Sequence, residues 1–148
     1  MTTITVPHSI DFTREDVAAA VADALAKVTD ATWTRAISRA ASNLAAGQFL
    51  YDGHRVTLRS ASSTRVYHID VHEPMKCSCK AHERGLVCWH ITAARLIVRA
   101  AERHQERSAR CPMCHAPIVG QQYYIGGRGY VYFDICSGDG SHNVTQAA

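Results

Sequence analysis

The spacing of apolar residues is helical over the first third of the chain. In "FTREDVAAAVADALAKVTD" apolar residues recur at three- and four-residue steps from Val17 to Val28, which predicts an amphipathic helix over about residues 14–28. Thr13 followed by Asp16 is close to a capping box and marks the start of that helix. "ATWTRAISRAASNLAAG" predicts a second helix that stops at Gly47. Its expected core face carries Trp33, Ile37, Ala40 and Leu44.

From residue 48 the apolar positions alternate. "QFLY", an Asp52-Gly53 turn, "RVTLRS" and "RVYHIDV" predict three short antiparallel strands. After residue 90, "ITAARLIVRAAERHQERSAR" returns to helical spacing and predicts a third helix. The tail places "GGRG" between "QQYYI" and "YVYFDI", which is typical of a hairpin.

These elements predict an α+β fold built from small helices and an antiparallel β-meander. We expect a helical segment over residues 1–47, a strand-and-helix module over 48–107 and a hairpin module over 108–148. The content of 47% hydrophobic and 20% charged residues over 148 residues is typical of a folded globular chain.

The beginning, "MTTITVPHSIDF", has neither the basic nor the apolar region of a signal peptide. The longest apolar runs fall far short of the roughly 20 residues that span a bilayer. We therefore expect an intracellular protein, cytoplasmic or nucleoid-associated, with no membrane partner.

Four of the chain's strongest metal-ligand residues lie within "CSCKAHERGLVCWH". In a reducing compartment, closely spaced cysteines are more often metal ligands than disulfides. Cys77 and Cys79 converge when they leave one face of an extended segment, and Cys88 and His90 converge when they straddle a helix start. Four protein ligands close the shell of a structural zinc ion. His72 and His82 are rival ligands for the same ion.

This stretch, with the strands before it and the apolar helix after it, resembles the SWIM zinc finger over roughly residues 48–104. The resemblance implies a ββα zinc module with ligands Cys77, Cys79, Cys88 and His90. It also implies a role in DNA binding or protein contact. Many members carry a proline after the second cysteine and a basic residue between the last Cys and His, where this chain has Lys80 and Trp89.

A second cluster lies in the tail, where "CPMC" is followed by "DICSGDGSH" across the hairpin. This arrangement resembles a zinc ribbon, and the preferred ligands are Cys111, Cys114, Cys136 and His142. Asp139 and His115 are alternatives for the fourth position. A redox Cys-x-x-Cys is disfavoured because it lacks a thioredoxin-like context and leaves Cys136 unexplained.

Two Cys3His sites would use all six cysteines and bind two zinc ions. Because such modules bury little apolar surface, metal should supply much of their folding free energy. We expect removal of zinc to melt the C-terminal half before the N-terminal helices. Three thiolates and one Zn²⁺ leave each site at about −1, which lowers the formal charge of +3 to about +1.

The distribution of charge says more about partners than its sum. Between residues 47 and 107 there are ten Lys and Arg against six Asp and Glu. These side chains are suited to phosphate contacts. The predicted nucleic-acid-binding residues are Arg55, Arg59, Arg65, Lys76, Lys80, Arg84, Arg95, Arg99 and Arg103. Tyrosines in the tail hairpin suggest base stacking, although a small hairpin also needs aromatic pairs for its own stability.

The chain contains no phosphate-cradling glycine loop, nucleophile elbow or carboxylate pair placed for acid–base chemistry. We therefore expect no enzyme and no small-molecule substrate. The leading hypothesis is a zinc-binding accessory protein that binds nucleic acid, with DNA preferred, in recombination, mobile-element function or regulation. The alternative is a zinc-stabilised adaptor that binds another protein, such as a recombinase partner. An exposed apolar patch on the first two helices would favour the adaptor.

Overall fold

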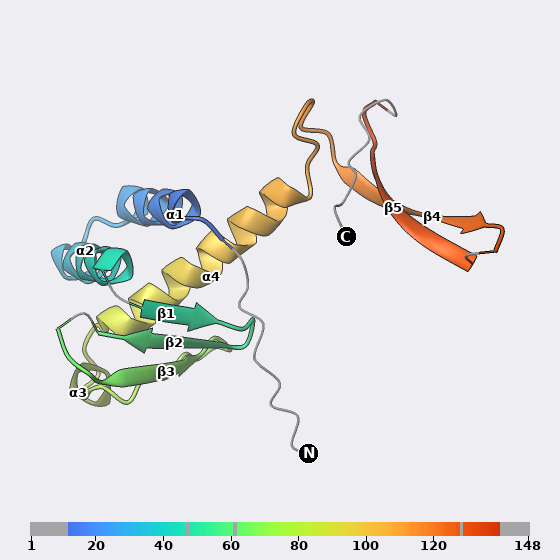
Figure 1. Cartoon of the computed structure of the whole chain (residues 1–148). Coiled ribbons are helices and arrows are strands. Elements are labelled where there is room, and N and C mark those ends of the chain that lie inside the picture. The colour runs from blue at the N-terminus through green and yellow to red at the C-terminus, as the bar shows by residue number, and fades with distance from the viewer. Residues whose placement is uncertain (1–11, 47, 61, 128, 140–148) are drawn as a thin grey trace, which may run out of the picture. The chain divides into compact units, whose positions relative to one another are not determined.

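The computed structural model describes residues 12–46, 48–60, 62–127 and 129–139, which form helices and antiparallel strands (Figure 1). The elements are α1 (Arg14–Lys27), α2 (Ala31–Ala46), β1 (Gln48–Tyr51), β2 (Arg55–Arg59), β3 (Val66–Asp70), α3 (Lys80–Glu83), α4 (Trp89–Ser108), β4 (Ile118–Ile125) and β5 (Gly129–Cys136). They divide into two compact units, Met1–His104 and Gln105–Ala148. The α+β class predicted from the sequence is confirmed. Over the described ranges, no helix has the length and apolar character that crossing a membrane requires.

Helix α1 begins at the capping box that the sequence predicts. The Thr13 hydroxyl accepts a hydrogen bond from the backbone N–H of Asp16, and the Asp16 carboxylate accepts one from the Thr13 N–H at 2.9 Å. Asp16 is only 3% exposed, and its carboxylate oxygen also lies 3.1 Å from Nδ1 of His104 on α4. The cap therefore provides hydrogen-bond acceptors for the free N–H groups at the start of α1, and it also fixes that start against α4.

Helix α2 packs with the face that the sequence predicts, except at its first turn. Ile37, Ala40 and Leu44 are buried, whereas Trp33 is 39% exposed, so the prediction that Trp33 faces the core is wrong. The buried positions of α2 begin only at Ala36, because the first turn, capped by the Asp30 carboxylate, extends beyond the packed part of the helix. The indole is left at the surface.

The three predicted strands form one antiparallel sheet in the order β1-β2-β3. The register pairs Val56 with Ile69 and Leu58 with Tyr67, so that the side chains of Val56, Leu58 and Ile69 all reach the core. The β1–β2 turn is held by the Asp52 carboxylate, which accepts backbone N–H bonds from His54 and Arg55. Those bonds hold the pKa of Asp52 below its usual value.

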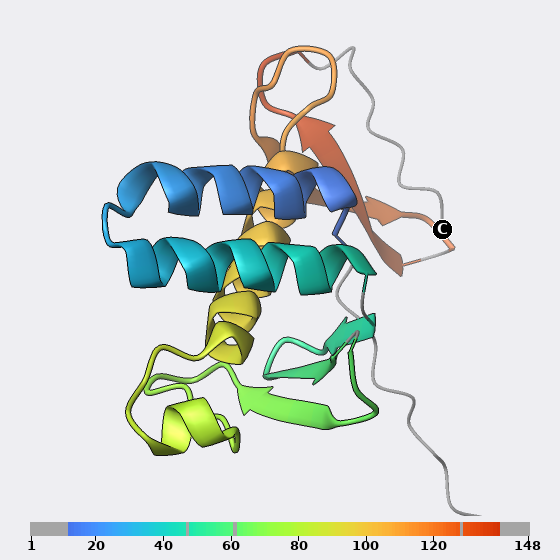
Figure 2. The ribbon, with the colours of Figure 1, turned by 90° about the vertical axis from the view of Figure 1, so that its left-hand side faces the viewer.

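A single core joins α1, α2, the sheet and α4. Figure 2 shows α1 and α2 side by side, with α4 passing across both of them. Small residues on α4, Ala93, Ala94 and Ala100, are fully buried in this core. Cys77, Cys79 and Cys88 belong to the same buried cluster as Ile37 and Leu44. The first cysteine cluster is therefore built into the core that supports the N-terminal helices.

Two features differ from the sequence-based elements. The four-residue helix α3 follows Cys79 directly and was not predicted, because one turn is too short to show apolar periodicity. The predicted hairpin is confirmed but longer, since β4 pairs with β5 from Ile118↔Cys136 to Ile125↔Gly129. Its inner end thereby lies next to the second cysteine cluster.

Candidate metal centres

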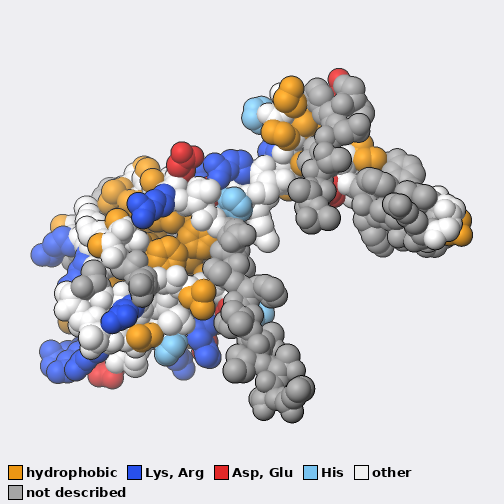
Figure 3. All heavy atoms as spheres, in the orientation of Figure 1, with side chains coloured by type: hydrophobic (Ala, Val, Ile, Leu, Met, Phe, Trp, Pro, Cys, Tyr) orange, Lys and Arg blue, Asp and Glu red, His pale blue; other side chains and the backbone are white. Residues whose placement is uncertain are grey.

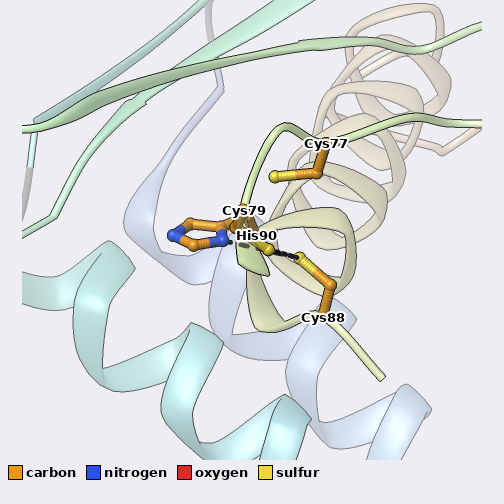
Figure 4. A group of neighbouring side chains, drawn as sticks. All are labelled: Cys77, Cys79, Cys88 and His90. Atoms are coloured by element: carbon orange, nitrogen blue, oxygen red, sulfur yellow. Dashed lines mark hydrogen bonds between the residues drawn. The ribbon is translucent and has the colours of Figure 1, made fainter. Parts of the chain in front are cut away.

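The four residues predicted to bind the first metal ion lie together in the structure (Figure 4). One donor atom from each of Cys77, Cys79, Cys88 and His90 lies within 4.8 Å of every other. The Sγ atoms of Cys79 and Cys88 are 3.2 Å apart, and Cys88 Sγ is 3.4 Å from Nδ1 of His90. All four residues are buried. We call this group site 1.

Two helix starts position the donors of site 1. Cys79 is the N-cap of α3, and its sulfur accepts the backbone N–H of His82 at 3.4 Å. Cys88 immediately precedes α4, and His90 is the second residue of that helix, as the spacing predicts. The positive end of α4 favours the thiolate of Cys88.

The His90 ring lies against two aromatic side chains. Its centroid lies 3.8 Å from that of Tyr67 on β3 and 3.9 Å from that of Trp89. The Trp89 ring in turn lies 5.7 Å from the Arg39 guanidinium on α2. This packing directs Nδ1 of His90 towards the sulfurs. The spacing of the cysteines did not reveal that Tyr67 and Trp89 help to orient this ligand.

The electrostatics of site 1 favour a bound cation. The hydrogen bond with Cys88, together with burial, raises the pKa of the Cys77 thiol. The same hydrogen bond lowers the pKa of Cys88, with help from His90 and the Ile91 N–H. Cys77 and Cys88 thus share a proton. Both thiols cannot ionise in a buried position unless a cation compensates the repulsion between the two negative charges. A divalent ion would remove that conflict, and three sulfurs with one imidazole are a donor set typical of structural zinc.

The two rival histidines do not join this group. His82 contributes its backbone N–H to Cys79, and His72 lies against the ring of His54, with the ring centroids 5.9 Å apart. Among residues whose positions are described, only the four predicted ligands form site 1.

A second group, site 2, consists of Cys111, Cys114 and Cys136. Their sulfurs lie within 4.8 Å of one another, with 3.3 Å between those of Cys114 and Cys136. Cys111 and Cys136 are buried, whereas Cys114 is exposed. The backbone N–H groups of Asp139 and Gly138 lower the pKa of Cys136, which favours the thiolate needed by a metal.

Tight backbone turns assemble site 2. The Cys111 N–H donates to the Ala116 carbonyl at 2.8 Å, and the His115 N–H donates to the Cys111 carbonyl at 2.8 Å. Gly138 returns the chain close to this turn. A Cβ at residue 138 would lie 2.8 Å from the Cβ of Ala116 and 3.3 Å from Sγ of Cys114. Sequence reasoning missed this constraint, although a glycine two residues after Cys136 was its visible signal.

The fourth donor of site 2 stays a prediction. His142, the preferred residue, lies outside the described residues. His115 and Asp139 are described, but neither has a donor atom within the three-sulfur group. The structure therefore brings together three of the four residues expected at this site.

The nine basic residues predicted to bind nucleic acid fall into two sets. Three form ion pairs: Arg55 with Asp70, Arg95 with Glu73, and Arg103 with Asp23. Six are exposed, with no carboxylate within ion-pair distance in the described part of the chain: Arg59, Arg65, Lys76, Lys80, Arg84 and Arg99. Figure 3 shows Lys and Arg side chains at the end of the sheet near α3.

The two cysteine-rich groups could each hold a metal ion, and their donor atoms are compatible with zinc-finger-like modules. This is the class of protein that the sites indicate. No protein-family model matches the sequence, and comparisons with curated proteins and with solved structures found no match. The assignment of this class therefore depends on the geometry of the donor atoms.

Proposed function

We propose that this chain is a small zinc-binding accessory protein that binds nucleic acid, DNA in particular, in transactions such as recombination, mobile-element function or regulation. The observation that carries the proposal is a set of exposed basic side chains, in the same compact unit as site 1, that have no carboxylate partner among the described residues. The sequence resemblance to the SWIM zinc finger supports it.

Four of these side chains surround one end of the sheet. Arg59 and Arg65 flank the β2–β3 turn, where the Ser60 N–H donates to the Arg65 carbonyl at 3.4 Å. Lys80 opens α3 and Arg84 directly follows it. Figure 1 shows the β2–β3 turn and α3 at the same end of the sheet. We call Arg59, Arg65, Lys80 and Arg84 the basic end.

The proposed zinc at site 1 would hold the basic end in place. Cys79 is both a candidate ligand and the N-cap of α3, so a metal bound there orders the helix that presents Lys80 and precedes Arg84. Fixed cations lose less conformational entropy when they bind phosphates. In this proposal the metal is structural, and the arginine and lysine side chains make the contacts.

Fluorescence anisotropy of a labelled duplex tests the proposal with the zinc-loaded full chain. We expect affinity to fall steeply between about 50 mM and 200 mM salt. Changing Arg59 and Arg65 to Gln should weaken binding for all sequences alike and flatten the salt slope by about 1 for each arginine replaced. Arg55→Gln is the matched control, because the Arg55 guanidinium is already paired with Asp70 at 2.8 Å. Absence of binding at low salt would reject the proposal.

The alternative function, a protein adaptor, is favoured by one observation. A hollow of about 550 Å³ lies between α1, α2 and β1, and its lining is apolar apart from Thr13 and Arg14. Figure 3 shows hydrophobic side chains exposed in this region. It suits the apolar face of a partner's helix with a carboxylate near Arg14. A zinc-loaded chain that binds no DNA at low salt would favour this function.

A further inference from the structure

A smaller hollow of about 260 Å³ lies beside site 1. Three separate parts of the chain supply apolar walls: Trp33 on α2, Met75 ahead of Cys77, and Leu86 in the loop between α3 and α4. Trp33 is 39% exposed and Leu86 is 61% exposed. Large apolar side chains that converge at a surface hollow indicate a binding site more often than isolated ones do.

The polar groups of this hollow are arranged so that its lining carries little net charge. Glu73 and Arg95 both line it and pair with each other at 3.2 Å. The Thr92 hydroxyl is buried and donates to the Cys88 carbonyl. The hollow, whose lining also includes His82, therefore suits an apolar or neutral group that can accept or donate a hydrogen bond.

Two cations lie next in sequence to residues that line the hollow. Lys76 directly follows Met75, and Arg84 directly precedes Gly85, and both Met75 and Gly85 line the hollow. Both cations are exposed and have no carboxylate partner among the described residues. A ligand complementary to this surface carries a flat apolar group, which suits the Trp33 indole, with negative charge beside it.

We propose that this hollow binds one unstacked base of a single-stranded nucleic acid. The base lies against the Trp33 indole and the Leu86 side chain, while Lys76 and Arg84 contact the phosphates on either side. A nucleotide strand provides this alternation of planar base and phosphate, and base–aromatic stacking tolerates any sequence. The inference rests on the proposed function and deepens it, because it names the form of nucleic acid.

The hollow also explains why a duplex should bind less well. In a duplex the bases are stacked and paired, and extracting one costs a few kcal/mol. The walls depend on site 1, since Cys88 lines the hollow and Met75 lies two residues before Cys77. Base binding should therefore require the metal-loaded protein.

Tryptophan fluorescence of the zinc-loaded full chain tests the inference. In a Trp89→Phe background, Trp33 is the remaining indole. We expect dT12 to quench it and to bind about tenfold more tightly than a 12-base-pair duplex of mixed sequence. Trp33→Ala and Leu86→Ala, read by anisotropy, should each weaken dT12 binding roughly tenfold. Trp33→Phe should retain most of the affinity, because it keeps an aromatic face.

The matched control is Leu50→Ala on β1, where the leucine is 38% exposed and does not line this hollow. It should leave dT12 affinity unchanged, and a zinc content of two per chain verifies that each variant is folded.

If dT12 and duplex bind equally and neither Trp33→Ala nor Leu86→Ala weakens dT12 binding, the inference is overturned while the proposed function stands. Loss of all binding at low salt overturns both. Quenching of Trp33 by an acidic, leucine-containing 12-residue peptide but not by dT12 would assign the hollow to a protein partner and overturn the inference.

Discussion

At the scale of single residues, Gly138 is the tightest constraint on site 2. Replacing it with Ala would bring a methyl group to 2.8 Å from the Ala116 Cβ and 3.3 Å from Cys114 Sγ. The backbone must move to relieve that contact, and the move displaces the N–H groups of Gly138 and Asp139 that favour the Cys136 thiolate. We expect Gly138→Ala to weaken metal binding at site 2 by about tenfold or more, as measured by chelator competition.

Gly126→Ala is the matched control for that substitution. A Cβ at residue 126 meets nothing within 4 Å, and the residue lies far from the cysteines in the hairpin register. It should leave the affinity of both sites unchanged. Equal metal affinity in Gly138→Ala and Gly126→Ala would show that site 2 tolerates a shift of its return turn.

The sequence predicted which donor residues lie together where spacing alone decides geometry. Cys77, Cys79, Cys88 and His90 meet because an extended pair and a helix start each bring two donors together locally. The partners of Arg95 and Arg103 were not predictable, because Glu73 and Asp23 are distant in the chain and belong to other segments. Contacts of that kind depend on tertiary packing, and no local pattern encodes them.

At the scale of elements, the start of α1 makes a second prediction. Asp16→Ala removes the acceptor for the Thr13 N–H and for His104, and we expect it to destabilise the protein by about 1 to 2 kcal/mol. Urea unfolding followed by circular dichroism measures the change. Glu15→Ala, an exposed acidic residue in the same turn, should cost far less. Equal losses would mean that the macrodipole of α1, rather than the Asp16 hydrogen bonds, stabilises this helix start.

Helices and strands were predicted where several turns or alternations repeat the same pattern. Apolar periodicity located α1, α2 and α4, and alternation located β1 to β3. The one-turn helix α3 was not predicted, because its start is set by the Cys79 cap rather than by apolar spacing. Trp33 was misassigned because periodicity identifies a helix face and does not reveal where along the helix the core ends.

At the scale of the whole molecule, the shared core changes the expected result of metal removal. Because Cys77, Cys79 and Cys88 pack in one cluster with Ile37 and Leu44, emptying site 1 should destabilise α1 and α2 along with the sheet. This replaces the sequence-based expectation that the N-terminal helices would outlast the C-terminal half. Metal analysis should give two zinc ions per chain, and a value near zero would reject the metal sites.

Two variants distinguish the contributions of the sites. Cys88→Ser should lower the zinc content to one and reduce the far-ultraviolet helical signal on heating well before the wild type. Cys111→Ser should also lower the zinc content to one, yet leave the melting of α1 and α2 nearly unchanged, because site 2 lies in the unit Gln105–Ala148. Identical melting curves for both variants would contradict the assignment of site 1 to the shared core.

The orientation of His90 has a spectroscopic consequence. Its Nδ1 faces Cys88 Sγ, so coordination there would leave the ring proton on Nε2 and fix a single tautomer. Nitrogen-15 chemical shifts of the imidazole distinguish that tautomer from its isomer without reference to any activity. The same nitrogen-15 shifts would therefore report whether the metal ion remains coordinated to His90 when DNA is added to the protein in solution.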